Sequence, residues 1–182
     1  MDSYQVVKSE KTYKGQILNV TVDTITMPHG GEAFRETVLH NGGSAVLPVD
    51  SDGNVILVRQ YRHSAKNLVL EIPAGIREPN EDPYDCAIRE LEEETGFKTG
   101  KLGFLTAMYS AIGFCSEVIY IYYADKLSPG VQNLDRDEFI ELERYPLEKA
   151  VEMVFNGEIR DSKTIAAIFM YQNLITKHSC NQ

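Results

Sequence analysis

The sequence predicts an α/β protein, in which an α/β/α sandwich surrounds a mixed β-sheet and a small β extension precedes it. Three observations carry this prediction. Strand-like segments run through most of the chain, a helix with its own start and stop signals interrupts them at residues 83–95, and two helical patterns close the chain. Strands flanked by helices bury the apolar faces of both in a layered sandwich.

Length and composition fit an ordinary globular protein. The chain has 182 residues, of which 43% are hydrophobic and 25% charged, and this is enough for one domain with a sizeable core. No apolar run approaches the roughly 18 residues of a membrane helix. The first residues lack the basic and apolar regions of a secretory signal. We therefore expect a cytoplasmic protein without a membrane partner.

The charge and the cysteines exclude several functions. A formal net charge of −9 argues against a nucleic-acid partner, because binding a polyphosphate backbone needs a basic face. A small anionic substrate is compatible if a divalent metal ion and a few arginines reverse the local potential. The three cysteines lack metal-ligand spacing, which indicates neither a disulfide framework nor a zinc site.

The N-terminal segment, residues 1–40, has an extended pattern. It is clearest at 16–23, where polar and β-branched residues alternate, and His29-Gly30-Gly31 indicates a turn. So small a piece cannot hold its own core and must pack on the rest or on a second subunit. We expect residues 1–40 to be a β extension that supports a homodimer, and residues 41–182 to form the main domain.

The main domain opens with strand patterns. Residues 44–49 and 55–62 flank a glycine-containing turn and predict a β-hairpin. Further strands are predicted at 68–72, 102–109, 117–124 and 138–145.

Two helices are predicted at the C-terminal end. Pro146 opens the first, which Gly157 ends, and Asp161 caps the second. Their apolar faces are expected to contain Leu147, Ala150, Val151, Val154 and Phe155 in the first helix, and Ile165, Ile168, Phe169 and Gln172 in the second.

The helix at residues 83–95 carries the chemistry. Asp82 can accept from the free N–H groups of the first turn, Pro83 lacks a donor that would be left unpaired there, and Gly96 supplies the stop. Glu90, Glu93 and Glu94 then share one face at i, i+3 and i+4. Three carboxylates on one arc repel one another unless a cation neutralises them, and carboxylate oxygens select hard ions such as Mg²⁺ or Mn²⁺.

The segment 75–97 resembles a known family. It matches every fixed position of the Nudix hydrolase signature, G-x5-E-x7-R-E-U-x-E-E-x-G-U, with Leu91 and Phe97 at the bulky U positions. The resemblance implies a Nudix-type sandwich and hydrolysis of a nucleoside diphosphate linked to another group. It also implies Mg²⁺, which Mn²⁺ can replace, held by the three glutamates and by the backbone carbonyl of Ala74.

Two further residues of this segment have a choice of roles. Arg89 can reach Glu93 at i, i+4, either as an ordinary ion pair or to orient a metal ligand, and these readings are compatible. Glu81 lies near the start of the helix and either joins the site or assists the cap.

The general base is expected on a later loop. Nudix enzymes that cleave nucleoside diphosphate sugars tend to place it there, and the stretch Asp137-Glu138-Phe139-Ile140-Glu141 resembles theirs. Glu138 is the first choice, with Glu141 and Asp137 in reserve. Some members of the family use a glutamate of the signature, which keeps Glu93 open as the base.

The resemblance extends to the ADP-ribose pyrophosphatase subgroup over most of the chain. Its other matching pieces are residues 59–62 and 70–75. Arg62 is the expected phosphate contact, because a guanidinium fork suits phosphate geometry. Arg59 is either a second contact or a surface charge, and Glu71 is expected to accept a hydrogen bond from the base or sugar.

One departure bears on the substrate. Ile112 stands where ADP-ribose hydrolases usually carry proline. We keep ADP-ribose as the first candidate and expect wider use of nucleoside diphosphate sugars, including GDP-mannose. The alternatives are a Nudix enzyme for nucleoside triphosphates or dinucleoside polyphosphates, and a binding module that does not cut. The complete set of signature glutamates favours an enzyme.

Overall fold

The computed structural model describes residues 4–136 and 138–180. It consists of two compact units. The first contains residues 4–42 and 109–118, and the second contains residues 43–108 and 119–180. The first unit thus takes in the predicted extension together with a segment, 109–118, that the sequence analysis placed in the main domain.

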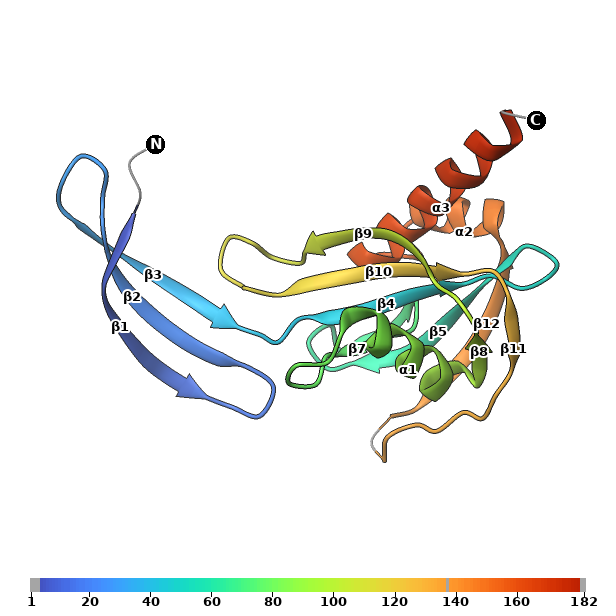
Figure 1. Cartoon of the computed structure of the whole chain (residues 1–182), viewed down its shortest axis with the longest axis horizontal. Helices are drawn as coiled ribbons and strands as arrows, with labels where there is room; N and C mark the ends of the chain where they lie inside the picture. The colour runs from blue at the N-terminus through green and yellow to red at the C-terminus, as the bar shows by residue number, and fades with distance from the viewer. Residues whose placement is uncertain (1–3, 137, 181–182) are drawn as a thin grey trace. The chain divides into compact units, whose positions relative to one another are not determined.

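The first unit is built on a three-stranded antiparallel sheet in the order β1-β2-β3, formed by β1 (Gln5–Lys14), β2 (Asn19–Thr26) and β3 (Glu32–Leu39) (Figure 1). The predicted turn between β2 and β3 is present, and Gly30 and Gly31 have φ of +87° and +85° there. Every residue of β1 is exposed. The segment 109–118 joins the edge of β3, where the amide of Val38 donates to the carbonyl of Phe114 at 2.7 Å.

In the second unit, the described residues form nine strands in three sheets. A four-stranded mixed sheet has the order β7-β4-β10-β9, a three-stranded sheet the order β12-β5-β6, and β11 pairs with β8. The strands are β4 (Gly43–Pro48), β5 (Asn54–Arg62), β6 (Asn67–Glu71), β7 (Ala74–Ile76), β8 (Phe97–Thr99), β9 (Gly103–Tyr109), β10 (Val118–Ala124), β11 (Leu127–Pro129) and β12 (Ile140–Pro146).

The helices cover opposite sides of these strands (Figure 1). Helix α1 (Pro83–Thr95) packs Ala87 and Leu91 against Val46 and Tyr122. Helices α2 (Leu147–Phe155) and α3 (Ser162–Cys180) lie over the other core, which contains Leu47, Leu57, Ile121, Met153 and Ile168. Two cores on two sides of a strand layer make the α/β/α sandwich, so the predicted fold class is confirmed.

The predicted hairpin is wrong. The turn at residues 50–54 forms, with the carboxylate of Asp50 accepting from the amides of Asp52 and Asn54, both at 2.9 Å. The strands on either side then enter different sheets and share only the bridge between Val49 and Val55. β4 is buried along its whole length and pairs in parallel with β10, which accounts for its continuous run of apolar residues.

Smaller differences have local causes. The last predicted strand begins at Ile140 rather than at 138, and the short strands β7, β8 and β11 were missed because three residues carry no periodic signal. Phe155 is 79% exposed instead of facing the core, since Leu147, Ala150 and Met153 take the inward positions of α2. No helix within 4–136 and 138–180 has the length and apolar character to cross a membrane.

Candidate active site

Helix α1 begins and ends as its sequence predicts. The carboxylate of Asp82 accepts from the amide of Tyr84 at 2.8 Å, and Pro83 occupies the first helical position. Gly96 has φ of +69°, and its amide donates to the carbonyl of Glu92 at 2.8 Å. These caps fix the length of the helix and hence the face on which its carboxylates lie.

Two of the three predicted carboxylates are buried. Glu90 is 7% exposed and Glu94 2%, whereas Glu93 is half-buried. Burial raises the pKa of Glu90 to about 7 and that of Glu94 to about 8. Each carboxyl also feels a negative neighbour, Glu93 for the first and Glu90 for the second, and the amide of Ala74 stabilises Glu94 with a 3.0 Å hydrogen bond. At neutral pH, Glu90 and Glu94 are therefore either partly protonated or ionised with a positive charge close by.

Gly75 allows β7 to pass directly over Glu90. A Cβ at this position would lie 1.9 Å from Oε1 of Glu90, which is far inside any permitted contact. The glycine that opens the segment 75–97 is thus required by a close approach of backbone to a buried carboxylate. Cys86 lies beside the same strand, is fully buried, and has a thiol pKa that burial raises to about 12.

Arg89 ties the acidic groups together. Its Nη1 donates to Glu90 at 2.6 Å and to Glu93 at 2.9 Å, while Nε and Nη2 donate to the two oxygens of Glu81 at 2.9 and 3.0 Å. The bidentate bond with Arg89 lowers the pKa of Glu81 to about 2. Glu81 accordingly orients Arg89, and the helix cap belongs to Asp82 alone.

The donor set fits a hard divalent cation. Among the described residues, no three His, Cys, Asp or Glu side chains are already gathered as a metal-binding group. Arg89 holds oxygens of Glu90 and Glu93. Glu94 has no ion-pair partner within 4–136 and 138–180, although its carboxyl is buried beside Glu90. Buried carboxylate oxygens in excess of local positive charge are the ligands that Mg²⁺ and Mn²⁺ prefer.

The predicted substrate contacts lie in ion pairs. Arg62 forms a bidentate pair with Glu71 at 2.7 and 2.9 Å, and Lys163 of α3 donates to the same carboxylate. Burial acts to raise the pKa of Glu71, but the two cations outweigh it and the pKa is lowered. Arg59 makes its own bidentate pair with Glu143, across the β5–β12 ladder. Glu71 is 2% exposed, so its oxygens face these cations rather than solvent.

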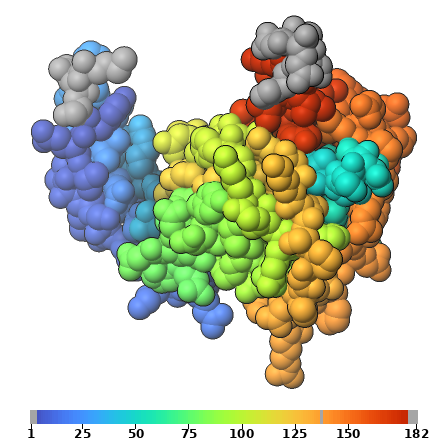
Figure 2. Space-filling view, turned by 45° about the vertical axis from the view of Figure 1, so that its right-hand side comes forward, coloured from blue at the N-terminus to red at the C-terminus, as the bar shows by residue number. Residues whose placement is uncertain are grey.

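The acidic loop lies against the end of α1. The amide of Asn133 donates to the carbonyl of Glu93 at 2.9 Å, and the side chain of Gln132 to that of Glu94 at 2.7 Å. In the space-filling view, the green surface of α1 and the orange surface that follows β11 adjoin on one face (Figure 2). Backbone hydrogen bonds to a helix end leave no mark in the sequence, so this docking cannot be predicted from the sequence alone.

The predicted bases differ in their surroundings. The charge of Glu138 contributes to the raised pKa values of both Glu90 and Glu94, which places it within electrostatic reach of the pair. One oxygen of Glu138 accepts from the amide of Asp135 at 3.1 Å. Glu141 is exposed on β12, opposite Arg59. Asp137 lies outside the described residues.

Sequence reasoning missed two polar residues near the site. Lys163 is 8% exposed in the first turn of α3. The only feature of the sequence that could have indicated it is its place two residues after Asp161, which caps the helix. Gln60 is 7% exposed, and its Nε2 has no hydrogen-bond partner in the part of the chain that the structure describes. It shares a face of β5 with Arg62, two residues on.

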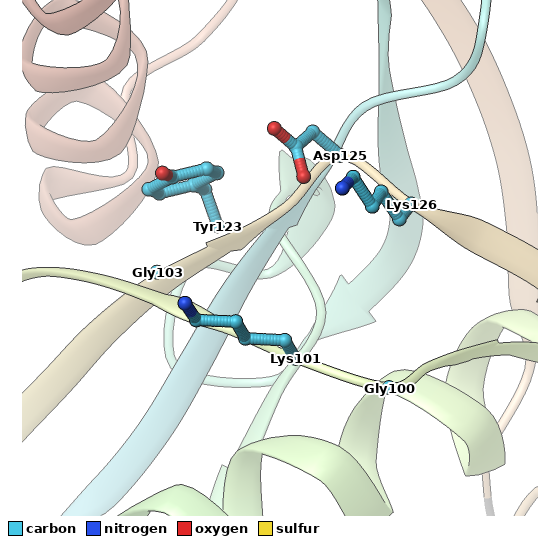
Figure 3. A pocket seen from close by; sticks show the side chains of 6 residues that line it. All are labelled: Gly100, Lys101, Gly103, Tyr123, Asp125 and Lys126. Carbon is cyan, nitrogen blue, oxygen red and sulfur yellow. The ribbon is translucent and has the colours of Figure 1, made fainter.

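A hollow of about 310 Å³ lies elsewhere on the second unit. It is lined by Gly100, Lys101, Gly103, Tyr123, Asp125 and Lys126, whose charged side chains stand around an open depression (Figure 3). None of the residues of the segment 75–97 lines it. We locate the candidate active site at the carboxylates of α1, because buried carboxyls with raised pKa values are typical of functional sites.

Comparison with known proteins shows which family the chain resembles. The family model described as the NUDIX domain matches residues 39–168. An ADP-ribose pyrophosphatase of Bacillus subtilis (strain 168) is 38% identical over 166 residues, which are 90% of either chain, and a methanol dehydrogenase activator of Bacillus methanolicus is 36% identical over the same shares. A GDP-mannose pyrophosphatase of Yersinia pestis (strain Pestoides F) is 32% identical over 155 residues, 77% of either chain.

A solved structure shares the fold. The crystal structure of an ADP compounds hydrolase superposes with a TM-score of 0.87 and covers 98% of this chain and 97% of its own, at 23% sequence identity. At that identity the match speaks for the architecture alone. The family match spans well over half of the chain, and the relatives span most of it. The chain therefore belongs to the NUDIX domain family, and its prediction as a Nudix hydrolase of the ADP-ribose pyrophosphatase type is confirmed.

Proposed function

We propose that this protein hydrolyses the pyrophosphate bond of nucleoside diphosphate sugars to a nucleoside monophosphate and a sugar phosphate. ADP-ribose is the first candidate and GDP-mannose the second. Relatives named for these two substrates support the proposal. So do the complete acidic face of α1 and the arginines that precede it on β5.

The observation that carries the proposal is the buried pair Glu90 and Glu94. Two carboxyls with pKa values raised to about 7 and about 8 at a helix face are costly unless a cation compensates them. Glu90, Glu93 and Glu94, with the carbonyl of Ala74, would hold a divalent ion, Mg²⁺ first and Mn²⁺ in its place. Such an ion, when bound, stabilises negative charge on the phosphoryl oxygens during substitution at phosphorus.

The protein's own side chains position the reactants. Arg89, held by Glu81, fixes Glu90 and Glu93 in orientation. Arg62 offers its guanidinium fork to the pyrophosphate, because its side chain is 40% exposed while its partner Glu71 is buried. Arg59 is less available, since Glu143 and the β5–β12 ladder hold it. Glu71 acts on the substrate through Arg62.

Glu138 is the general base in this proposal. Its carboxylate lies on the loop that docks on α1 and acts electrostatically on both buried glutamates. An oxygen of Glu138 takes the proton of the attacking water, which a carboxylate in reach of the site can do once substrate binds. Glu93 is the alternative within the signature, and Glu141 is a weaker one because it is exposed on β12.

We further propose a cytoplasmic homodimer without a nucleic-acid or membrane partner. The support is the net charge of −9 and the exposed sheet of the first unit, where Val6, Val7, Tyr13 and Phe34 are 56–70% exposed. Apolar side chains on a small sheet without its own core are typical of a surface that another chain covers.

A substrate panel tests the proposal. ADP-ribose, GDP-mannose, other nucleoside diphosphate sugars, ATP and a dinucleoside tetraphosphate would be incubated with Mg²⁺, and the products identified by mass spectrometry. We expect kcat/KM for at least one nucleoside diphosphate sugar to exceed that for ATP by about 100-fold or more. Preferred cleavage of triphosphates or dinucleoside polyphosphates would reject the substrate class, and tight binding without cleavage would make the protein a binding module.

A further inference from the structure

Lys163 lies in an environment that disfavours a charged lysine side chain. It is 8% exposed, and it lies in the first turn of α3, where the positive end of the helix dipole disfavours a cation. Its compensation comes from two carboxylates. Its ammonium donates to Oε2 of Glu71, and it lies 3.1 Å from the carboxylate of Asp161, which caps the helix.

The carboxylate of Glu71 is therefore paired with two cations, Arg62 and Lys163, although one would neutralise it. Arg62 holds both of its oxygens, and Lys163 shares Oε2. The two cations differ in exposure, since the side chain of Arg62 is 40% exposed and that of Lys163 10%, beside a glutamate side chain at 3%. Arg62 is therefore open to solvent on one side, whereas Lys163 is enclosed with the carboxylate.

The Arg62–Glu71 pair lies close to Glu94 through the chain. Glu71 is three residues before Ala74, whose amide donates to the carboxylate of Glu94 at 3.0 Å, and the charges of Arg62 and Glu94 act on each other. Arg62 is thus placed to meet a phosphate at the site, but it must first give up part of its bidentate ion pair with Glu71. A lone buried Glu71 would resist this, because an uncompensated buried carboxylate is strongly unfavourable.

We propose that Lys163 is a positioning residue that takes over as the counter-ion of Glu71 when Arg62 binds the substrate's pyrophosphate. This inference rests on the proposed function and adds a residue to it. Lys163 touches no substrate. It lowers the free energy needed for Arg62 to leave Glu71. Arg62 can then bind the pyrophosphate of the substrate while Lys163 neutralises the carboxylate of Glu71.

The test is a double-mutant cycle on Lys163 and Glu71. The variants are Lys163→Met, Glu71→Gln, the double variant and, as the matched control, Lys149→Met on α2, whose exposed ammonium pairs with Glu152 at 3.2 Å. Two sets of measurements are made with Mg²⁺ present. The first is the Kd for methylenediphosphonate, a pyrophosphate analogue whose P–C–P bridge is not hydrolysed, and the second is kcat and KM for the best sugar nucleotide.

The proposal predicts that Lys163→Met raises Kd and KM by about tenfold or more, since Arg62 is then the sole partner of Glu71, and changes kcat by less than about threefold. In the Glu71→Gln background, where no carboxylate needs a counter-ion, removal of Lys163 should leave Kd unchanged. Lys149→Met should match the wild type.

Several outcomes would overturn the inference. A Lys163→Met protein that melts earlier but binds normally would make Lys163 purely structural. Equal effects of Lys163→Met in both backgrounds would mean that it does not act through Glu71. If Lys163→Met fails to fold, the comparison of Glu71→Gln with the double variant still tests the proposal, because a difference in Kd between these two variants would contradict it. A wild-type protein that does not bind the diphosphonate would also contradict it. Coupling seen with diphosphonate but no sugar nucleotide cleaved would keep the inference and reject the proposed substrate.

Discussion

At the scale of single residues, Glu90 and Glu94 make stability depend on pH. Their pKa values of about 7 and about 8 lie above the usual 4.5, so the folded protein holds these protons more tightly than the unfolded chain. The contribution of these protons to the free energy of unfolding is complete below about pH 4.5, where both carboxyls are protonated in either state. It is lost as the pH rises through the folded-state pKa values of about 7 and about 8. Without metal, stability should fall between pH 5.5 and 8.5 by on the order of a few kcal/mol.

Thermal melting in EDTA across this range, against melting with Mg²⁺, measures the effect. Glu94→Gln should flatten the metal-free profile and lower turnover by orders of magnitude while the fold survives. Glu81 and Glu71 stay ionised in this window because their pKa values are lowered, so they do not confuse the result. A flat wild-type profile, or near-normal turnover of Glu94→Gln at saturating Mg²⁺, would remove Glu94 from the site.

Glu138 provides the second prediction at this scale. If it takes the proton of the attacking water, Glu138→Gln should lower kcat by roughly 10²–10⁴-fold with little change in KM, because the lost interaction belongs to the transition state. Steady-state kinetics of Glu138→Gln, Glu141→Gln and Asp137→Asn would rank the three. Retention of most of the kcat by Glu138→Gln, together with its loss in Glu93→Gln, would move the base into the signature.

The sequence predicted single residues well where spacing or chemistry determined them. Asp82, Gly96 and the carboxylates of α1 follow from helical periodicity and capping. The pair of Arg89 with Glu93 follows from the same spacing. The sequence could not predict that Arg89 would also hold Glu81 and Glu90, or that Lys163 would reach a glutamate 92 residues away. Such contacts depend on the tertiary packing of separate elements, which leaves no local pattern.

At the scale of elements, the strand β7 and helix α1 depend on the missing side chain of Gly75. In Gly75→Ala the new methyl group would collide with Glu90, so either the strand or the carboxylate must shift. We expect turnover to fall on the order of 100-fold and Mg²⁺ to bind less tightly. Kinetics and calorimetric Mg²⁺ titration measure this.

Gly100→Ala is the control, because no atom lies within 4 Å of its added Cβ. It should keep wild-type turnover. If Gly75→Ala were as active as Gly100→Ala, the close approach of β7 to Glu90 would have no part in catalysis.

Element prediction failed where pairing is not local. The apolar runs at 44–49 and 55–62 indicate two strands correctly, but a short turn between them suggested a hairpin. β4 instead pairs in parallel with β10 and antiparallel with β7. β5 pairs with β12, whose partner residues lie 80 to 92 positions later in the chain. Burial of both faces of β4 favours the centre of a mixed sheet, and only the partners from later in the chain reveal it.

At the scale of the whole molecule, the proposed homodimer concerns residues 1–40. The sheet β1-β2-β3 exposes large apolar side chains, and its strand β1 has no buried residue. The full-length protein should sediment as a dimer at micromolar concentration, and a variant lacking residues 1–40 as a monomer or an aggregate. Analytical ultracentrifugation measures both. A monomeric full-length protein would contradict the proposal.

We propose that the acidic face of α1 makes this protein a metal-dependent pyrophosphatase for nucleoside diphosphate sugars. The most direct test of this proposal is the rate at which ADP-ribose is converted to AMP and ribose 5-phosphate as Mg²⁺ is titrated into EDTA-treated protein. We predict no conversion without metal, a saturable rise with Mg²⁺, and the same behaviour with Mn²⁺. Conversion that does not depend on metal, or none of ADP-ribose and GDP-mannose at any Mg²⁺ concentration, would contradict the account.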